Sequence, residues 1–107
     1  MAVKNIFEFG ENVYNILFSE EGLVPKTHQG DASMAEAVDG ELLMKQGDLY
    51  TDPVSGEIGV VADTYAFLAG ESKPVAVIVA GHLVSERLSA EAVAKATDFA
   101  AQGLFLH

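Results

Sequence analysis

Residues 74–107 constrain the fold of this chain more than any other stretch. Residues 74–80 are apolar at nearly every position, which is typical of a central strand covered on both faces. A glycine turn is expected at Gly81. Ser89 is a suitable N-cap for a helix, and Gly103 would end that helix in a left-handed conformation. Residues 104–106 then read as a last apolar strand, so the stretch predicts one helix packed against a sheet.

The expected helix separates its polar and apolar side chains onto two faces. The polar face carries Glu91, Lys95, Asp98 and Gln102. The apolar face carries Ala92, Val93, Ala96, Phe99 and Ala100. The glycine stop would also bring Leu104 against Phe99.

Short apolar segments separated by turn residues fill the middle of the chain. The turn signals are Asp39-Gly40, Gln46-Gly47 and residues 52–56. They separate expected strands at residues 42–44, 48–51 and 58–62. Gly59 inside the third strand indicates a bulge or a close backbone approach. Residues 33–38 are compatible with a strand or a helical turn, and residues 63–73 read as a polar loop.

Residues 1–30 differ from the rest of the chain, because they are rich in aromatic side chains and repeatedly broken by acids, Gly10, Gly22 and Pro25. We interpret them as an extended N-terminal arm, with residues 26–31 as a loop. The alternative is that this segment packs on its own core. Residues 31–107 form the expected domain. The fold class predicted is α+β, mostly β: a small, barrel-like body of short strands with one C-terminal helix.

The charge balance excludes several kinds of partner. Six lysine and arginine residues face sixteen aspartate and glutamate residues, for a formal net charge of −10. Nucleic acids and anionic membranes are therefore poor partners, since both are bound through basic side chains. The chain has no cysteine, which removes disulfides and thiolate chemistry. Neither a membrane span nor a secretory signal is expected from the sequence.

No catalytic signature stands out, so the chain is not expected to be an enzyme or to hold a cofactor or metal. The three histidines, His28, His82 and His107, lack metal-ligand spacing, and His82 is expected to be exposed after the turn. A Ser33–His28–Asp31 triad has no nucleophile elbow around its serine. Asp31, Asp39, Asp48, Asp52 and Asp63 lie near turns, where aspartate is common.

Two weaker alternatives remain open at this point. Carboxylates from the acidic turns could flank a sugar, as in a small carbohydrate-binding or carboxylate-based enzyme domain, or bind calcium. Lys45, followed by Gln46-Gly47, could be the modified lysine of a carrier domain.

From Gly40 onward, the order of features resembles that of lambda-type phage head decoration proteins. The matching stretches are Gly40-Glu-Leu-Leu-Met-Lys, Gly47-Asp-Leu-Tyr, Ile58-Gly-Val-Val-Ala-Asp, Pro74-Val-Ala-Val-Ile-Val-Ala-Gly-His and Ala101-Gln-Gly-Leu-Phe-Leu. The segment Phe7-Glu-Phe-Gly resembles the start of relatives in that family.

The resemblance implies a homotrimer that binds the major capsid protein on the outer surface of an expanded phage head and stabilises it against packaged DNA. Such a protein is made in the host bacterial cytoplasm and ends in the virion. The family's arm, which corresponds to residues 1–24 here, orders on the shell and pairs with capsid strands. The capsid-binding residues expected in this arm are Ile6, Phe7, Phe9, Val13, Tyr14, Ile16, Leu17 and Phe18.

Overall fold

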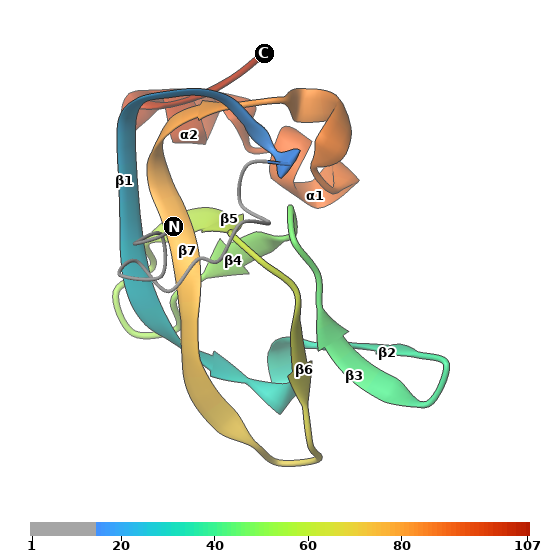
Figure 1. Ribbon diagram of the computed structural model, residues 1–107. Helices are drawn as coiled ribbons and strands as arrows, with labels where there is room; N and C mark the ends of the chain where they lie inside the picture. Colours follow the sequence, from blue (N-terminus) through green and yellow to red (C-terminus); the bar gives the residue numbers. More distant parts are fainter. Residues whose placement is uncertain (1–14) are drawn as a thin grey trace, which may run out of the picture.

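The computed structural model describes residues 15–107, which form two mainly antiparallel sheets with two short helices at one end (Figure 1). The strands are β1 (Leu17–Asp31), β2 (Glu36–Val38), β3 (Glu41–Met44), β4 (Leu49–Thr51), β5 (Ile58–Val61), β6 (Tyr65–Phe67), β7 (Ser72–Leu83) and β8 (Leu104–Leu106). The helices are α1 (Ala90–Val93) and α2 (Ala96–Ala101), and single 3-10 turns span η3 (Ala32–Met34) and η4 (Ser85–Arg87). The mostly-β prediction is confirmed.

Strand β7 organises the larger sheet. Strands β1, β7, β5 and β4 follow one another in that order, and β8 joins β7 as a parallel neighbour over residues 81–83. The second sheet has the order β2, β3, β6. Residues 75–79 of β7 are buried on both faces, as predicted for a central strand.

The two faces of β7 belong to two different core clusters, because successive strand side chains point in opposite directions. Ala76 and Ile78 pack with the helices and β8, in a cluster that includes Phe99 and Leu104. The opposite face, with Val75, Val77 and Val79, packs towards the second sheet, together with Met44, Tyr50, Val61 and Phe67. The two core clusters therefore lie on opposite faces of β7.

The strands and turns expected between Asp39 and residue 62 are present. Asp39 and Gly40 both have positive φ, at 51° and 84°, in the turn that joins β2 to β3. Residues 33–38 contain the end of η3 followed by β2. The loop expected over residues 63–73 is wrong in part, since it contains β6 and the start of β7. Among the described residues, no helix has the length and apolar character needed to cross a membrane.

The single helix expected after Ser89 is wrong, because the segment forms two short helices. Ser89 does cap the first, since its Oγ accepts a hydrogen bond from the Ala92 N–H at 3.2 Å. The backbone leaves helical geometry at Lys95, with φ −97° and ψ 14°, and α2 begins after it. Gly103 ends α2 with φ 87°, as expected for a glycine stop.

Three side chains of this segment face differently from the prediction. Gln102 was assigned to the polar face, but its Nε2 donates to the carbonyl oxygens of Ile58 and Val79, each at 2.8 Å. Val93 and Ala100 are expected on the apolar face, but both are exposed, and Val93 is 39% exposed. The chain breaks at Lys95 between the two helices. The polar and apolar faces predicted for one continuous helix therefore do not form.

The loop expected over residues 26–31 is also wrong. Residues 17–31 form β1, which pairs antiparallel with β7 along most of its length (Figure 1). The pairing register shifts between Ser19 and Val24, where Gly22 has a φ of 69°, and again at Pro25. The residues that suggested a break therefore mark irregularities within an edge strand, where glycine and proline are tolerated. The part of the expected arm after residue 16 belongs to the sheet.

Gly81 forms no turn, contrary to the sequence prediction. It stays within β7 and pairs with Leu104 of β8. A Cβ at Gly81 would lie 3.2 Å from the Leu23 Cα, so the glycine lets the irregular part of β1 come close to β7. His82 is consequently a strand residue, paired with Phe105.

Candidate functional site

The predicted capsid-binding residues divide into four groups. Ile6, Phe7, Phe9, Val13 and Tyr14 lie outside the described residues. Ile16 is only 2% exposed and belongs to the core, so its assignment as a contact residue is wrong. Leu17 is half-buried and packs against the same core. Phe18 is 59% exposed and is available at the surface.

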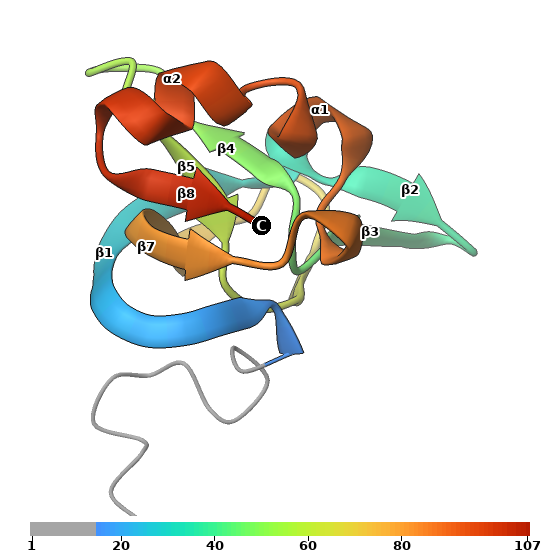
Figure 2. The same cartoon turned by 90° about the horizontal axis from the view of Figure 1, so that it is seen from above.

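The start of the described chain and its last residue lie at the same end of the molecule. The Val84 N–H donates to the Ile16 carbonyl oxygen at 2.8 Å, and the Ser85 N–H donates to the His107 carbonyl oxygen at 2.9 Å. Leu83 pairs with Leu17 on one side and with Leu106 on the other. Seen from above, this end shows the start of β1, the end of β7 and the C-terminus together (Figure 2).

Four rings cover this end, and we call them the aromatic end patch: Phe18, His82, Phe105 and His107. Phe18 stacks on His107, with ring centroids 4.1 Å apart and planes 13° from parallel. His82 stacks on Phe105 at 5.4 Å and 28°. The two imidazoles join these stacks, because His82 Nδ1 lies 2.9 Å from His107 Nε2.

The aromatic end patch is suited to binding a macromolecular surface. Phe18 and Phe105 are 59% and 43% exposed, although large apolar side chains are usually buried. Neither imidazole forms an ion pair with a carboxylate among the described residues. Phenylalanine rings supply a large apolar contact area, and aromatic residues are enriched in protein interfaces.

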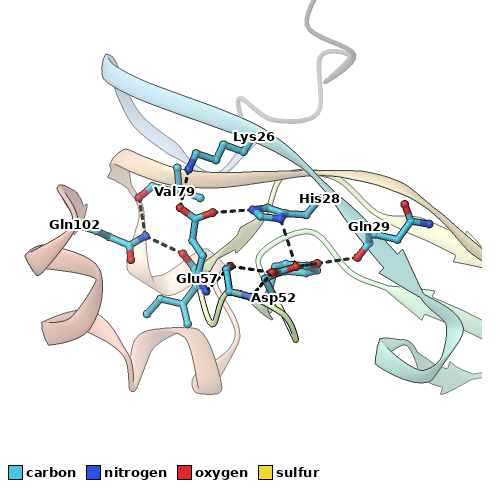
Figure 3. A network of polar contacts seen from close by, with 10 residues as sticks. Lys26, His28, Gln29, Asp52, Glu57, Val79 and Gln102 are labelled. Carbon is cyan, nitrogen blue, oxygen red and sulfur yellow. Dashed lines mark hydrogen bonds and ion pairs between the residues drawn. The ribbon is translucent and has the colours of Figure 1, made fainter.

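A second cluster connects the turn between β4 and β5 to β1 (Figure 3). Glu57 accepts from Lys26 at 2.8 Å and lies 2.8 Å from His28 Nε2. The ring of His28 stacks on Tyr50 at 5.2 Å, and its Nδ1 lies 3.6 Å from Asp52. The hydrogen bond from Lys26, and next the one from His28, hold the pKa of Glu57 below its ordinary value of 4.5.

The carboxylates of this cluster are already occupied by partners within the fold. Asp52 accepts hydrogen bonds from the N–H and hydroxyl of Ser55, both at 2.8 Å, and these bonds lower the pKa of Asp52. The cluster thus fixes a turn. The triad weighed from the sequence does not form, because Asp31 accepts from the Ser72 hydroxyl whereas His28 contacts Glu57.

A third feature is a surface hollow of about 680 Å³, which we call the acidic hollow. Its charged lining residues are Glu36, Lys45, Asp48, Glu86, Arg87 and Glu91. Burial raises the pKa of the Asp48 carboxyl, against the lowering effect of the hydrogen bond that it accepts from the Lys45 N–H at 3.0 Å. Lys45 Nζ also lies 3.8 Å from Glu36.

Sequence reasoning found Phe18 but missed the other three rings of the aromatic end patch. Their meeting depends on the parallel pairing of β8 with β7, which places Phe105 beside His82. The described residues hold no group of three or more histidine or acidic side chains arranged to bind a metal ion. Comparisons of this chain with protein-family models, curated proteins and solved structures found no match.

Proposed function

We propose that this chain is a phage head decoration protein, which binds the outer surface of an expanded capsid as a trimer and stabilises it. The observation that supports this proposal best is the aromatic end patch, because it lies where Asn15 connects the body to residues 1–14. One end of the molecule thus offers exposed rings beside the attachment of an apolar segment. These two elements can bind the same surface together.

The physical basis of the binding is surface burial strengthened by multivalency. Phe18 and Phe105 lose exposed apolar area when they contact a partner, and their rings can fill shallow pockets there. The apolar segment before Asn15 could add a strand to an exposed edge of the major capsid protein. A homotrimer presents three such ends, so weak single contacts combine into strong binding. Binding only to the expanded lattice stabilises that lattice by mass action.

Co-sedimentation with expanded, undecorated heads tests the proposal. We expect the full chain to pellet with the heads at micromolar concentration, and no co-sedimentation would overturn the proposal. Phe18→Ala should weaken binding at least about tenfold if Phe18 acts as a hot spot, because truncating a hot-spot residue costs about 2 kcal/mol or more and about 1.4 kcal/mol corresponds to tenfold. Val54→Ala is the matched control, because Val54 is 94% exposed in the turn between β4 and β5.

Deleting residues 1–14 tests the contribution of the N-terminal segment. This deletion leaves Ile16 and every described strand in place, whereas a longer one would remove the core side chain of Ile16. We expect the shortened protein to fold and to lose head binding. Undiminished binding would show that the segment has no role in it.

The trimeric state has its own test. The mass in solution from light scattering should equal three chains, either for the free protein or for protein released from heads. A single-chain mass in both samples would contradict the trimer. Assembly and head binding are therefore measured separately.

The acidic hollow favours a second candidate, a small acidic carbohydrate-binding or carboxylate-based enzyme domain. A carboxyl with a raised pKa is a feature of general acids in glycoside cleavage, and Asp48 has one. A screen of oligosaccharides for binding and hydrolysis tests this candidate. Loss of a detected activity in Asp48→Asn would support it, and the absence of any binding or hydrolysis would remove it.

A further inference from the structure

The paired imidazoles at the centre of the aromatic end patch have a consequence for its response to acid. His82 and His107 are joined by one short contact, 2.9 Å between His82 Nδ1 and His107 Nε2. An imidazole nitrogen either carries a proton and donates, or carries a lone pair and accepts. The pair therefore needs at least one acceptor nitrogen, which only a neutral imidazole provides.

We propose that acid opens this imidazole pair, rearranges the aromatic end patch and weakens docking to the capsid. The docking part of this proposal rests on the proposed function, whereas the rearrangement concerns the free protein alone. Whether the pair opens depends on how many protons the two imidazoles have bound. One added proton keeps the contact, because an imidazolium can donate to a neutral imidazole. A second leaves two donors and two like charges facing each other, and the contact is lost.

The backbone around the pair determines which ring moves. The His107 N–H donates to the Leu83 carbonyl oxygen at 2.9 Å, and the His107 carbonyl oxygen accepts from the Ser85 N–H and hydroxyl, both at 2.9 Å. His82 lies within β7 and is paired with Phe105. The main chain is thus held on both sides, so once the contact between the rings is lost, the exposed side chain of His107 is the part that can rotate. Its rotation would remove the stacking partner of Phe18.

Among residues 15–107, few charged groups near the pair can offset this effect. On β1, Phe18 and Ser19 face the pair, and the acids Glu20 and Glu21 follow them. On β8 the facing residue is Phe105. On η4, next to Ser85, are Glu86 and Arg87; Arg87 donates to the Asn15 carbonyl oxygen. Among the described residues, no carboxylate forms an ion pair with either imidazole, so none stabilises a doubly protonated pair directly.

A glutamine at position 82 separates this mechanism from a general effect of acid. A glutamine amide carries both a donor and an acceptor, so it can pair with His107 whether or not that ring is protonated. His82→Gln should therefore resist acid. His28→Gln is the matched control, because His28 contacts Glu57 and lies outside the aromatic end patch.

The first measurement is proton NMR of the full chain at pH 7.5 and about pH 5, a range in which histidine side chains take up protons. At pH 7.5 the ring current of Phe18 should displace the ring proton signals of His107. In acid this displacement should disappear in the wild type and in His28→Gln but remain in His82→Gln. A displacement that persists in the acidified wild type, or vanishes equally in His82→Gln, would overturn the proposal.

The second measurement is binding to expanded heads at the same two pH values. The wild type and His28→Gln should lose about tenfold in affinity on acidification, and His82→Gln less than about twofold. Equal losses in all three proteins, or no loss in the wild type, would overturn the docking part. Failure of the wild type to bind heads at pH 7.5 would instead defeat the proposed function, while the NMR measurement still decides the rearrangement.

Discussion

Gly59 in β5 is predicted to be a position where even one added methyl group destabilises the fold. A Cβ at this position would lie 2.4 Å from the Val77 Cγ1, 2.7 Å from the Ile78 carbonyl oxygen and 3.3 Å from the Val79 Cγ1. Each belongs to β7, which pairs with β5 directly. The carbonyl oxygen is backbone, so it can move only if the pairing of the two strands changes.

The expected cost of Gly59→Ala follows from two opposing terms. Overpacking a well-filled core costs about 1–3 kcal/mol, and the backbone contact places this site in the upper half of that range. Alanine also restricts the unfolded chain, which returns about 0.4–1 kcal/mol. We therefore expect a net loss of about 2 kcal/mol in the free energy of unfolding. For a domain of this size, that lowers the unfolding midpoint by about 8–16 °C.

A double-mutant cycle with Val77→Ala separates this steric effect from a general loss of strand propensity. Val77→Ala alone should cost about 2 kcal/mol, since Val77 is fully buried. In the double variant, the new methyl group at position 59 occupies the space that the Val77 Cγ1 filled in the wild type. In urea unfolding, the double variant should lose about 1 kcal/mol less free energy of unfolding than the two single variants lose together. Additive losses, or a Gly59→Ala protein as stable as the wild type, would refute the reasoning.

Three further predictions concern stability. Ser89→Ala removes the helix cap and should cost about 1 kcal/mol in urea unfolding; an unchanged midpoint would show that the cap hydrogen bond contributes nothing. Gln102→Ala should cost about 1–3 kcal/mol, because two strand carbonyl oxygens lose their side-chain donor, and a neutral result would mean that water replaces it. Glu57 has a lowered pKa in the folded state, so its stabilising contribution is present above pH 4.5 and is lost as the pH falls through the folded pKa. The advantage of the wild type over Glu57→Gln should therefore shrink below about pH 4.5, and a pH-independent difference would contradict this account.

The parts of the fold that could be predicted from the sequence are those fixed by local signals. Asp39-Gly40 turns because both residues adopt positive φ, and the Ser89 cap follows from its hydroxyl. The core strand over residues 74–80 was predicted because continuous apolar character reports burial on both faces. The close backbone approach at Gly59 was also predicted, since glycine inside a strand often marks one.

Strand β1 could not be predicted in the same way, because its partner lies far along the chain. Lys26, Thr27 and Gln29 are polar and read locally as a loop, yet they pair with residues 74–77 of β7. Gly22 and Pro25 also discourage a strand, although the irregular edge pairing tolerates both. The break in the helix at Lys95 had no local signal either, since alanine-rich sequence favours one continuous helix.

The candidate site also combines a feature that could be predicted from local sequence with features that could not. Phe18 could be predicted as a contact residue because it belongs to the aromatic-rich segment 1–30, whereas its stacking on His107 depends on strands that lie far apart in sequence. The contact between His82 and His107 requires β8 to pair in parallel with β7 at one particular register. Such a register is set by core packing and has no counterpart in local patterns.

The burial of Ile16 determines how tension on the preceding segment would enter the body. A pull on residues 1–14 meets its first described core anchor at Ile16, whose carbonyl oxygen is bonded to Val84 and whose side chain is 2% exposed. The load then passes to Leu17, which pairs with Leu83 at the end of β7. Detaching the body by force would therefore begin with the extraction of one core side chain, and Ile16→Ala should lower the rupture force measured by an optical trap.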